Sequence, residues 1–216
     1  MKEYPRLLNP SLRRISLIAV LAVSHLLASY TARAQAPVVT ATLTGSNGTS
    51  TVNITSSQSF TLTLTISTNF VSSGITYFLQ VNAAGSGFFR IDARDASGSP
   101  YPTPPLVCSG PGDPCLLNPV NDFDLGGTNN GSDTDPAGTY TIATFTISAL
   151  NAPVGQYTIS TDRGIVTDRT GGGFEDRAFG AVATINVVPE PGTVGLGLLG
   201  ASVVAVMAWR RKRTAA

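Results

Sequence analysis

The stretch that decides the fold reads S-F-T-L-T-L-T-I-S and covers residues 59–67. Large apolar residues alternate here with threonine and serine, and a period of two is typical of a β-strand with one buried and one solvent-exposed face. The segment 179–187 alternates in the same way, with one side formed by Phe179, Ala181, Ala183, Ile185 and Val187. Both segments, 59–67 and 179–187, therefore predict β-strands.

Other segments of the same region also have β character. Strands are predicted at 38–44, 51–55, 75–81, 88–92, 139–148, 156–160 and 165–167, and no long segment has helical periodicity. Within 139–148 the apolar residues change phase between Ile142 and Ala143, which a β-bulge or burial on both sides would explain. About nine short strands separated by Gly, Asn and Pro predict an all-β fold, an antiparallel β-sandwich over residues 35–188.

The N-terminus has the layout of a targeting segment. Basic residues precede an apolar run from residue 15 to about residue 28, and small residues follow. This order predicts a secretory signal peptide over residues 1–34, cleaved after Ala34. A signal anchor that stays in the membrane is the alternative, although the apolar run is short for a span.

The C-terminus carries a second apolar segment. Residues 192–209 contain no charge and end in Trp209. As a helix this segment would reach about 27 Å, just short of a ~30 Å hydrocarbon core. A basic cluster follows at once and is expected on the cytoplasmic side: Arg210, Arg211, Lys212 and Arg213. We therefore expect a single transmembrane helix, with the middle of the chain outside the cytoplasm.

Three residues directly before the apolar segment complete a recognisable pattern. Pro189, Glu190 and Pro191, followed by the apolar helix and the basic cluster, resemble a PEP-CTERM sorting tail over residues 189–213. The resemblance implies that the chain is an exosortase substrate. An exosortase-type transpeptidase would recognise the tail at the inner membrane, remove the helix and transfer the protein to the cell surface or its polysaccharide matrix. An ordinary membrane anchor, with Pro-Glu-Pro as a stiff spacer, is the alternative.

The strand order resembles that of cohesin-like domains. The segment 59–66 is similar to their early strand, and 138–147 is similar to their late strand, with Gly138, Ala143 and Phe145 in a G-x-x-x-x-A-x-F pattern. Segments 155–159 and 165–168 continue in the same order. The resemblance implies a cohesin-like β-sandwich. A Pro/Gly-rich insertion from about residue 96 to 138 departs from the pattern, so dockerin binding is not carried over.

The composition of residues 35–188 restricts the chemistry. This region contains five arginines and eleven carboxylates, a net charge of −6, and neither histidine nor lysine. Nucleophilic schemes that use histidine and histidine metal sites are excluded, and an acidic exterior argues against nucleic acid. Carboxylate pairs, Asp92 with Asp95 or Asp122 with Asp124, could in principle serve glycoside hydrolysis. Carboxylates in Gly-rich loops are commonly solvated turn residues, and no catalytic residue is assigned.

Two cysteines flank a turn-rich loop in the insertion. Cys108 and Cys115 enclose S-G-P-G-D-P. In an exported protein such a pair predicts a disulfide. A redox pair is the alternative, but it would need an activated thiolate, and neither lysine nor histidine is available to lower its pKa.

The segment 122–135 is rich in oxygen ligands. Asp122, Asp124 and Asp133, with Gly127 at the sixth position, partly match a calcium loop. The fifth position is glycine and no helices flank the segment, so an ordinary turn rich in Asx residues is the alternative.

Two functions fit these observations. We expect an exported, non-enzymatic cell-surface or extracellular-matrix protein that binds, or is embedded in, extracellular polysaccharide, or that binds a surface protein. A secreted, carboxylate-dependent polysaccharide hydrolase is the alternative. No cofactor is expected apart from calcium.

Overall fold

A computed structural model describes residues 35–101, 103–106, 108, 115–120, 123–128, 135–169, 173–190, 192 and 202. The chain divides into two compact units, Met1–Ala36 and Pro37–Ala216, and the described strands all belong to the second unit. The expected signal peptide, residues 1–34, lies outside the described residues.

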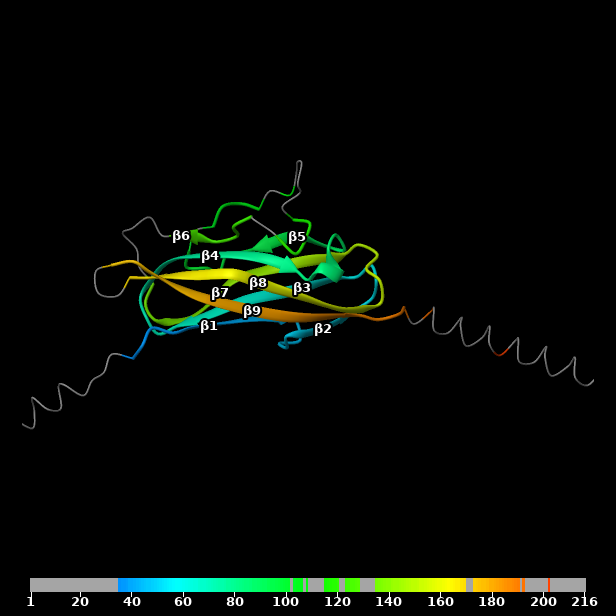
Figure 1. Cartoon of the computed structure of the whole chain (residues 1–216), viewed down its shortest axis with the longest axis horizontal. Helices are drawn as coiled ribbons and strands as arrows, with labels where there is room; N and C mark the ends of the chain where they lie inside the picture. Colours follow the sequence, from blue (N-terminus) through cyan, green and yellow to red (C-terminus); the bar gives the residue numbers. More distant parts are fainter. Residues whose placement is uncertain are drawn as a thin grey trace, which may run out of the picture. The chain divides into compact units, whose positions relative to one another are not determined.

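The described residues form nine strands in two sheets that pack face to face (Figure 1). One sheet has four strands in the order β1-β3-β7-β5, and the other has five in the order β2-β9-β8-β4-β6. The all-β sandwich predicted from the sequence is therefore confirmed. The strands are β1 (Val39–Gly45), β2 (Thr51–Ile54), β3 (Ser59–Thr68), β4 (Ser72–Val81), β5 (Phe89–Asp95), β6 (Gly127–Thr128), β7 (Gly138–Ala149), β8 (Gly155–Asp168) and β9 (Glu175–Val187).

One pairing differs from the expected antiparallel arrangement. β2 runs parallel to β9, with Ile54 opposite Val187. The turn after β1, closed by a hydrogen bond from Gly45 N to Thr49 O of 2.8 Å, moves the chain from the edge of one sheet to the edge of the other. The direction of β2 therefore follows from this crossing. Its partner β9 is the last strand of the domain, so the sequence around β2 does not indicate the pairing.

The deciding stretch lies in β3, inside the four-stranded sheet. Its apolar residues Phe60, Leu62, Leu64 and Ile66 are buried, and the threonines between them are half-buried on the outer side. The phase change expected in 139–148 is also confirmed. The β3–β7 register shifts after Leu64, and β7 buries both Ile142 and Ala143 at this bulge.

The prediction of two separate strands at 156–160 and 165–167 is wrong. These segments form one strand, β8, which pairs with β9 over its length and has a register shift between Thr161 and Gly164. Arg163 takes a positive φ of 54° at this point. The polar and glycine residues that resemble a turn in the sequence thus form a β-bulge, which bends the strand without ending it.

The insertion after β5 closes one side of the sandwich. Leu117 N donates to Phe89 O of β5 at 2.8 Å, and Leu125 N donates to Tyr77 O of β4 at 2.9 Å. These bonds connect the insertion to β5, an edge strand of one sheet, and to β4, which lies next to the edge strand β6 of the other. Gly126 is required for this approach, because a Cβ atom at this position would lie 1.9 Å from Ile75 O.

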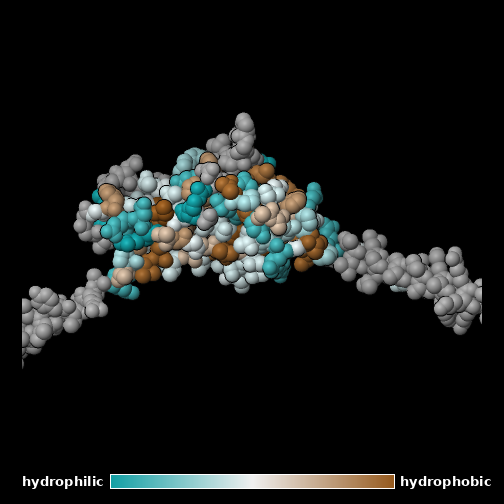
Figure 2. Space-filling model, viewed as in Figure 1, coloured by the Kyte–Doolittle hydropathy of each residue, from teal (hydrophilic) through white to brown (hydrophobic). Residues whose placement is uncertain are grey.

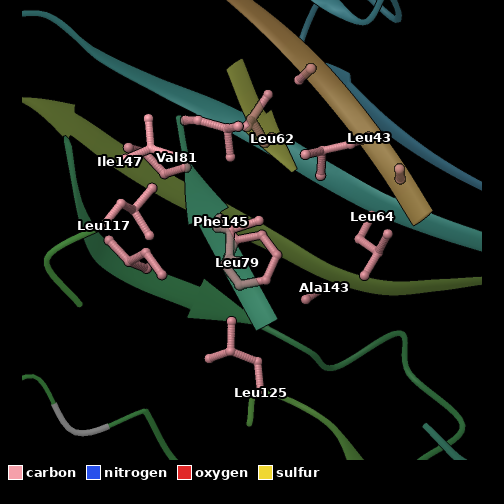
Figure 3. Close-up of a cluster of buried hydrophobic side chains, with 14 of the residues drawn as sticks. Leu43, Leu62, Leu64, Leu79, Val81, Leu117, Leu125, Ala143, Phe145 and Ile147 are labelled. Atoms are coloured by element: carbon pink, nitrogen blue, oxygen red, sulfur yellow. The ribbon is translucent and has the colours of Figure 1, made fainter. Parts of the chain in front are cut away.

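The insertion also contributes side chains to the core. Tyr101, Leu117 and Leu125 are almost fully buried, between 0 and 1% exposed. Figure 3 shows Leu117 and Leu125 in the same cluster as Leu79 and Phe145, which come from the two sheets. The segment that interrupts the expected pattern is therefore a structural part of the sandwich.

Candidate functional site

The sorting motif begins where the last strand ends. β9 ends at Val187, and Val188 N donates to Ile54 O at 2.8 Å as the last described backbone bond before the motif. Pro189 and Glu190 are exposed and lie outside any strand or helix. Proline fixes its own φ and disfavours helix in the preceding residue, so this approach is extended. The first two residues of the motif are therefore exposed while the domain before them is folded.

The remaining parts of the predicted tail are only sparsely described. Gly192 and Ser202 are helical, whereas Pro191, the rest of 192–209 and the basic cluster 210–213 lie outside the described residues. Within the part of the chain that the structure covers, no helix is both long and apolar enough to cross a membrane.

The predicted disulfide is confirmed. Cys108 and Cys115 are bonded, with 5.3 Å between their Cα atoms. Cys115 is fully buried, and its carbonyl accepts a 2.8 Å hydrogen bond from Ile91 N of β5. The bond therefore links the two ends of a loop in the insertion close to the edge of β5. A buried sulfur in this position suits a structural bond better than exchange with an external thiol.

Of the three predicted calcium ligands, only Asp124 belongs to the described residues. Its Oδ1 accepts hydrogen bonds from Tyr77 N at 3.2 Å and from Gly126 N at 2.8 Å. Asp122 and Asp133 lie outside the described part, and the residues within it contain no cluster of acidic, Cys or His side chains suited to a metal. Asp124 holds the insertion against β4, and calcium binding by this loop stays a prediction.

The carboxylates of β5 make hydrogen bonds within the sheet and its following turn. Asp92 accepts a hydrogen bond from the Ser148 hydroxyl on β7, and Asp95 accepts one from Ser97 N at 2.9 Å. The hydrogen bonds from Ser97 lower the pKa of Asp95 below its ordinary value. A general acid in glycoside hydrolysis needs a raised pKa instead. The lowered pKa therefore does not suit Asp95 to the role of general acid.

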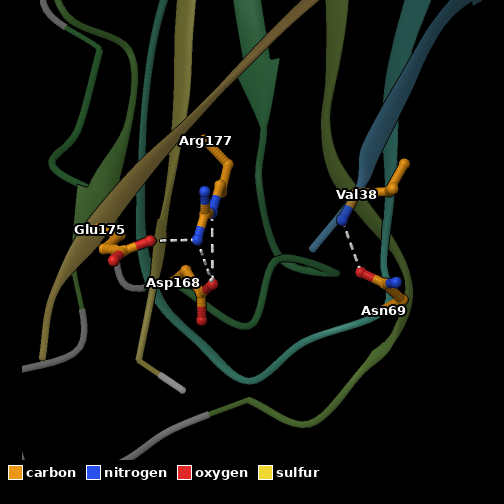
Figure 4. Close-up of polar contacts among 5 residues, drawn as sticks. All are labelled: Val38, Asn69, Asp168, Glu175 and Arg177. Atoms are coloured by element: carbon orange, nitrogen blue, oxygen red, sulfur yellow. Dashed lines mark hydrogen bonds and ion pairs between the residues drawn. The ribbon is translucent and has the colours of Figure 1, made fainter. Parts of the chain in front are cut away.

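One buried carboxylate was missed by the sequence reasoning. Asp168, at the end of β8, is 3% exposed and accepts hydrogen bonds from Arg177 Nε at 3.3 Å and Nη2 at 3.2 Å (Figure 4). Arg177 also contacts Glu175, the register partner of Asp168. The ion pair connects β8 to β9, so its role is structural.

A regular array of hydroxyl groups covers the outer side of the four-stranded sheet. We call the outward-facing serine and threonine residues of β1, β3 and β7 the hydroxyl face. All of these side chains are exposed or half-buried. The strand register places them in rows across the sheet, and three rows run through all three strands: Thr40–Ser67–Thr139, Thr42–Thr65–Thr141 and Thr44–Thr63–Thr144.

The sequence contained a signal for this array, because threonine alternates with other residues in three separate segments. What it did not contain was the register. Cross-strand hydrogen bonds confirm the alignment, with 3.2 Å between the Thr63 and Thr144 hydroxyls and 2.8 Å between those of Ser59 and Ser148. Figure 2 shows a face of the molecule on which hydrophobic residues occur in several separate groups among hydrophilic ones.

The comparisons with known proteins give one motif and one fold. Residues 187–212 match the PEP-CTERM protein-sorting motif, which begins at the last residue of β9. The chain therefore carries an exosortase-type sorting signal and is an exported protein. No curated protein matches the sequence.

Several solved structures resemble the sandwich at low sequence identity. A cohesin module from a Clostridium perfringens family 33 glycoside hydrolase is 10% identical, with a TM-score of 0.48 over 71% of this chain and 98% of that chain. The third ScaB cohesin of R. flavefaciens, solved in complex with a group 1 dockerin, is 11% identical, with a TM-score of 0.48 over 70% and 96%. A non-cellulosomal cohesin from Archaeoglobus fulgidus is 7% identical, with a TM-score of 0.45 over 74% and 96%. The likeness to these structures concerns the fold alone.

Proposed function

We propose that this chain is a non-enzymatic protein of the bacterial cell surface or extracellular matrix. Its precursor spans the inner membrane once, and an exosortase-type transpeptidase removes the C-terminal helix. The sandwich then remains outside the cell, where it binds extracellular polysaccharide or is embedded in it.

The observation that carries the proposal is the position of the sorting motif. It follows the folded sandwich without a spacer, because Val187 pairs with Ile54 and the exposed Pro189 comes two residues later. A cut within or near the motif would leave the whole domain intact. The absence of histidine and lysine from residues 35–188 supports a non-enzymatic role, since it removes the common nucleophilic mechanisms.

The proposal is tested in the producing bacterium. Intact mass of the protein recovered from the surface or matrix should show loss of Trp209 and of the basic cluster 210–213, with the cut near 189–192. Replacing the motif (Pro189→Ala, Glu190→Ala and Pro191→Ala) should leave the full tail in place and retain the protein in the membrane fraction. Pro153→Ala, in an exposed turn of the same domain, is the matched control and should be processed normally.

Two results would contradict the proposal. One is surface or matrix material that still contains Trp209 and the basic cluster, which would make the tail an ordinary anchor. The other is release of soluble sugars when the purified protein is incubated with the host's own polysaccharide, which would indicate a hydrolase.

A further inference from the structure

The hydroxyl face is an uncharged surface on an acidic domain. β1, β3 and β7, all of whose residues the structure describes, contain no charged side chain, whereas residues 35–188 have a net charge of −6. In the four-stranded sheet the charges are confined to the edge strand β5, where Asp92 accepts a hydrogen bond from Ser148 at the border of the face. None of the exposed large hydrophobic residues lies in the three strands of the face. The surface therefore lacks the apolar core typical of protein interfaces and the basic groups that an anionic polymer needs.

The hydroxyl groups of this face keep free hydrogen-bonding capacity. Thr139 Oγ1 donates to Ser67 Oγ at 3.0 Å, and the Thr63 and Thr144 hydroxyls are 3.2 Å apart. Each hydroxyl has one donor and two acceptor positions, so a bonded pair retains one donor and three acceptors. Such a pair can both accept hydrogen bonds from a ligand and donate one to it. A sugar hydroxyl has the same dual character.

The array is also periodic and stiff. Residues two apart on a strand are separated by about 7 Å, and neighbouring strands by about 4.8 Å, so the hydroxyl groups repeat in two directions. Threonine is restricted at χ1, which limits the entropy lost when its hydroxyl is held by a ligand. Its methyl group can contact the C–H faces of a sugar ring. A polymer with regularly repeated hydroxyl groups can therefore make many weak contacts at once, and their combined effect exceeds that of each alone.

We infer that the hydroxyl face is the surface through which the sandwich holds an uncharged polysaccharide chain. The inference rests on the proposed function and assigns the binding to the β1, β3 and β7 side of the domain. Because no charged group takes part, binding is insensitive to salt.

The test replaces one row of hydroxyl groups with methyl groups. The row variant is Thr44→Val, Thr63→Val and Thr144→Val, which preserves side-chain shape and β propensity. The matched control is a row on the outer side of the other sheet, Thr51→Val, Thr158→Val and Thr184→Val.

Both variants and the wild type are made as full chains, purified in a mild detergent and checked for equal melting temperature. They are then run in native gels that contain dextran, hydroxyethyl cellulose or glucomannan as neutral polymers, or alginate as an anionic one. We expect a neutral polymer to retard the wild type and the control, at low salt and at high salt alike. The row variant should bind at least about tenfold more weakly, because it lacks three hydroxyl groups and each hydrogen bond lost weakens binding about twofold or more.

The inference is overturned if no neutral polymer retards the wild type, if the two variants are retarded equally, or if retardation occurs only in alginate and disappears in salt. A failure here is distinct from a failure of the proposed function. A protein that is processed at its tail and recovered with the matrix, but whose row variant is retained equally well, contradicts only the assignment of the face.

Discussion

The structure makes the insertion between β5 and β7 a part of the core, and Leu117 tests this directly. Leu117 is fully buried, and its backbone N donates to Phe89 O at 2.8 Å. Leu117→Ala removes three carbon atoms from a packed site and leaves both backbone partners in place. The free energy of unfolding should fall by about 3 kcal/mol, from lost transfer free energy and from the cavity that remains.

This loss would be a large part of the total stability, since a domain of this size has about 5–15 kcal/mol in all. The loss is measured by urea unfolding of residues 35–188 without a reducing agent, so that the disulfide stays intact. The unfolding midpoint should fall to a lower urea concentration, and the dependence of the free energy on urea should not change. Val120→Ala is the matched control in the same insertion, because Val120 is 70% exposed. It should change the free energy of unfolding by less than about 0.5 kcal/mol.

The reasoning is refuted if Leu117→Ala is as mild as Val120→Ala. The insertion would then lie on the sandwich without stabilising it. Leu125→Ala provides a second measurement, because Leu125 is equally buried but contacts the β4 side of the core through its backbone bond to Tyr77.

Three further predictions concern the disulfide, the buried ion pair and a buried phenol. Removing the bond with Cys108→Ala and Cys115→Ala should lower the free energy of unfolding by about 2.5 kcal/mol from loop-closure entropy alone, as measured by urea unfolding. Arg177→Met leaves the buried Asp168 carboxylate without its ion pair, and we expect a loss of about 1–3 kcal/mol, since Arg177 is itself 30% exposed. Burial raises the pKa of Tyr101 from 10.0 to about 12. The folded state therefore holds this proton more tightly than the unfolded state, and stability should fall as pH rises from about 10 to 12.

Each of these has a specific control. Wild-type protein under reducing conditions should match the cysteine variant, and free alkylatable thiols in exported protein would contradict the disulfide. Glu175→Gln, at an exposed partner of Arg177, should be nearly neutral, and an equal loss in both variants would exclude a special role for Asp168. Tyr101→Phe should reduce the fall in stability between pH 10 and 12, although Tyr77 retains part of it because burial raises its pKa as well. An unchanged pH dependence would contradict the assignment to Tyr101.

Much of the sandwich could be predicted from local patterns, and the misses have physical causes. The alternation of apolar and polar residues identified β3 and β9, because one face of each strand packs in the core and the other faces water. The division of β8 at 161–164 was wrong, since a bulge and a turn use the same residue types and only pairing with β9 separates them. The ion pair of Asp168 and Arg177 was missed because nothing in the sequence indicates that Asp168 is buried. The insertion looked like a loop because its core residues do not alternate.

The sequence by itself determined the C-terminal sorting motif and the β character of the domain before it, and the N-terminal signal peptide stays a prediction. These are local properties: a run of apolar residues, a cluster of charges, a period of two. Tertiary structure alone decided that the insertion enters the core and that threonines from three strands form one face. The Thr63 and Thr144 hydroxyls meet across 81 residues of chain. Such contacts depend on strand order and register, which are set by how all buried side chains pack together and not by any single segment.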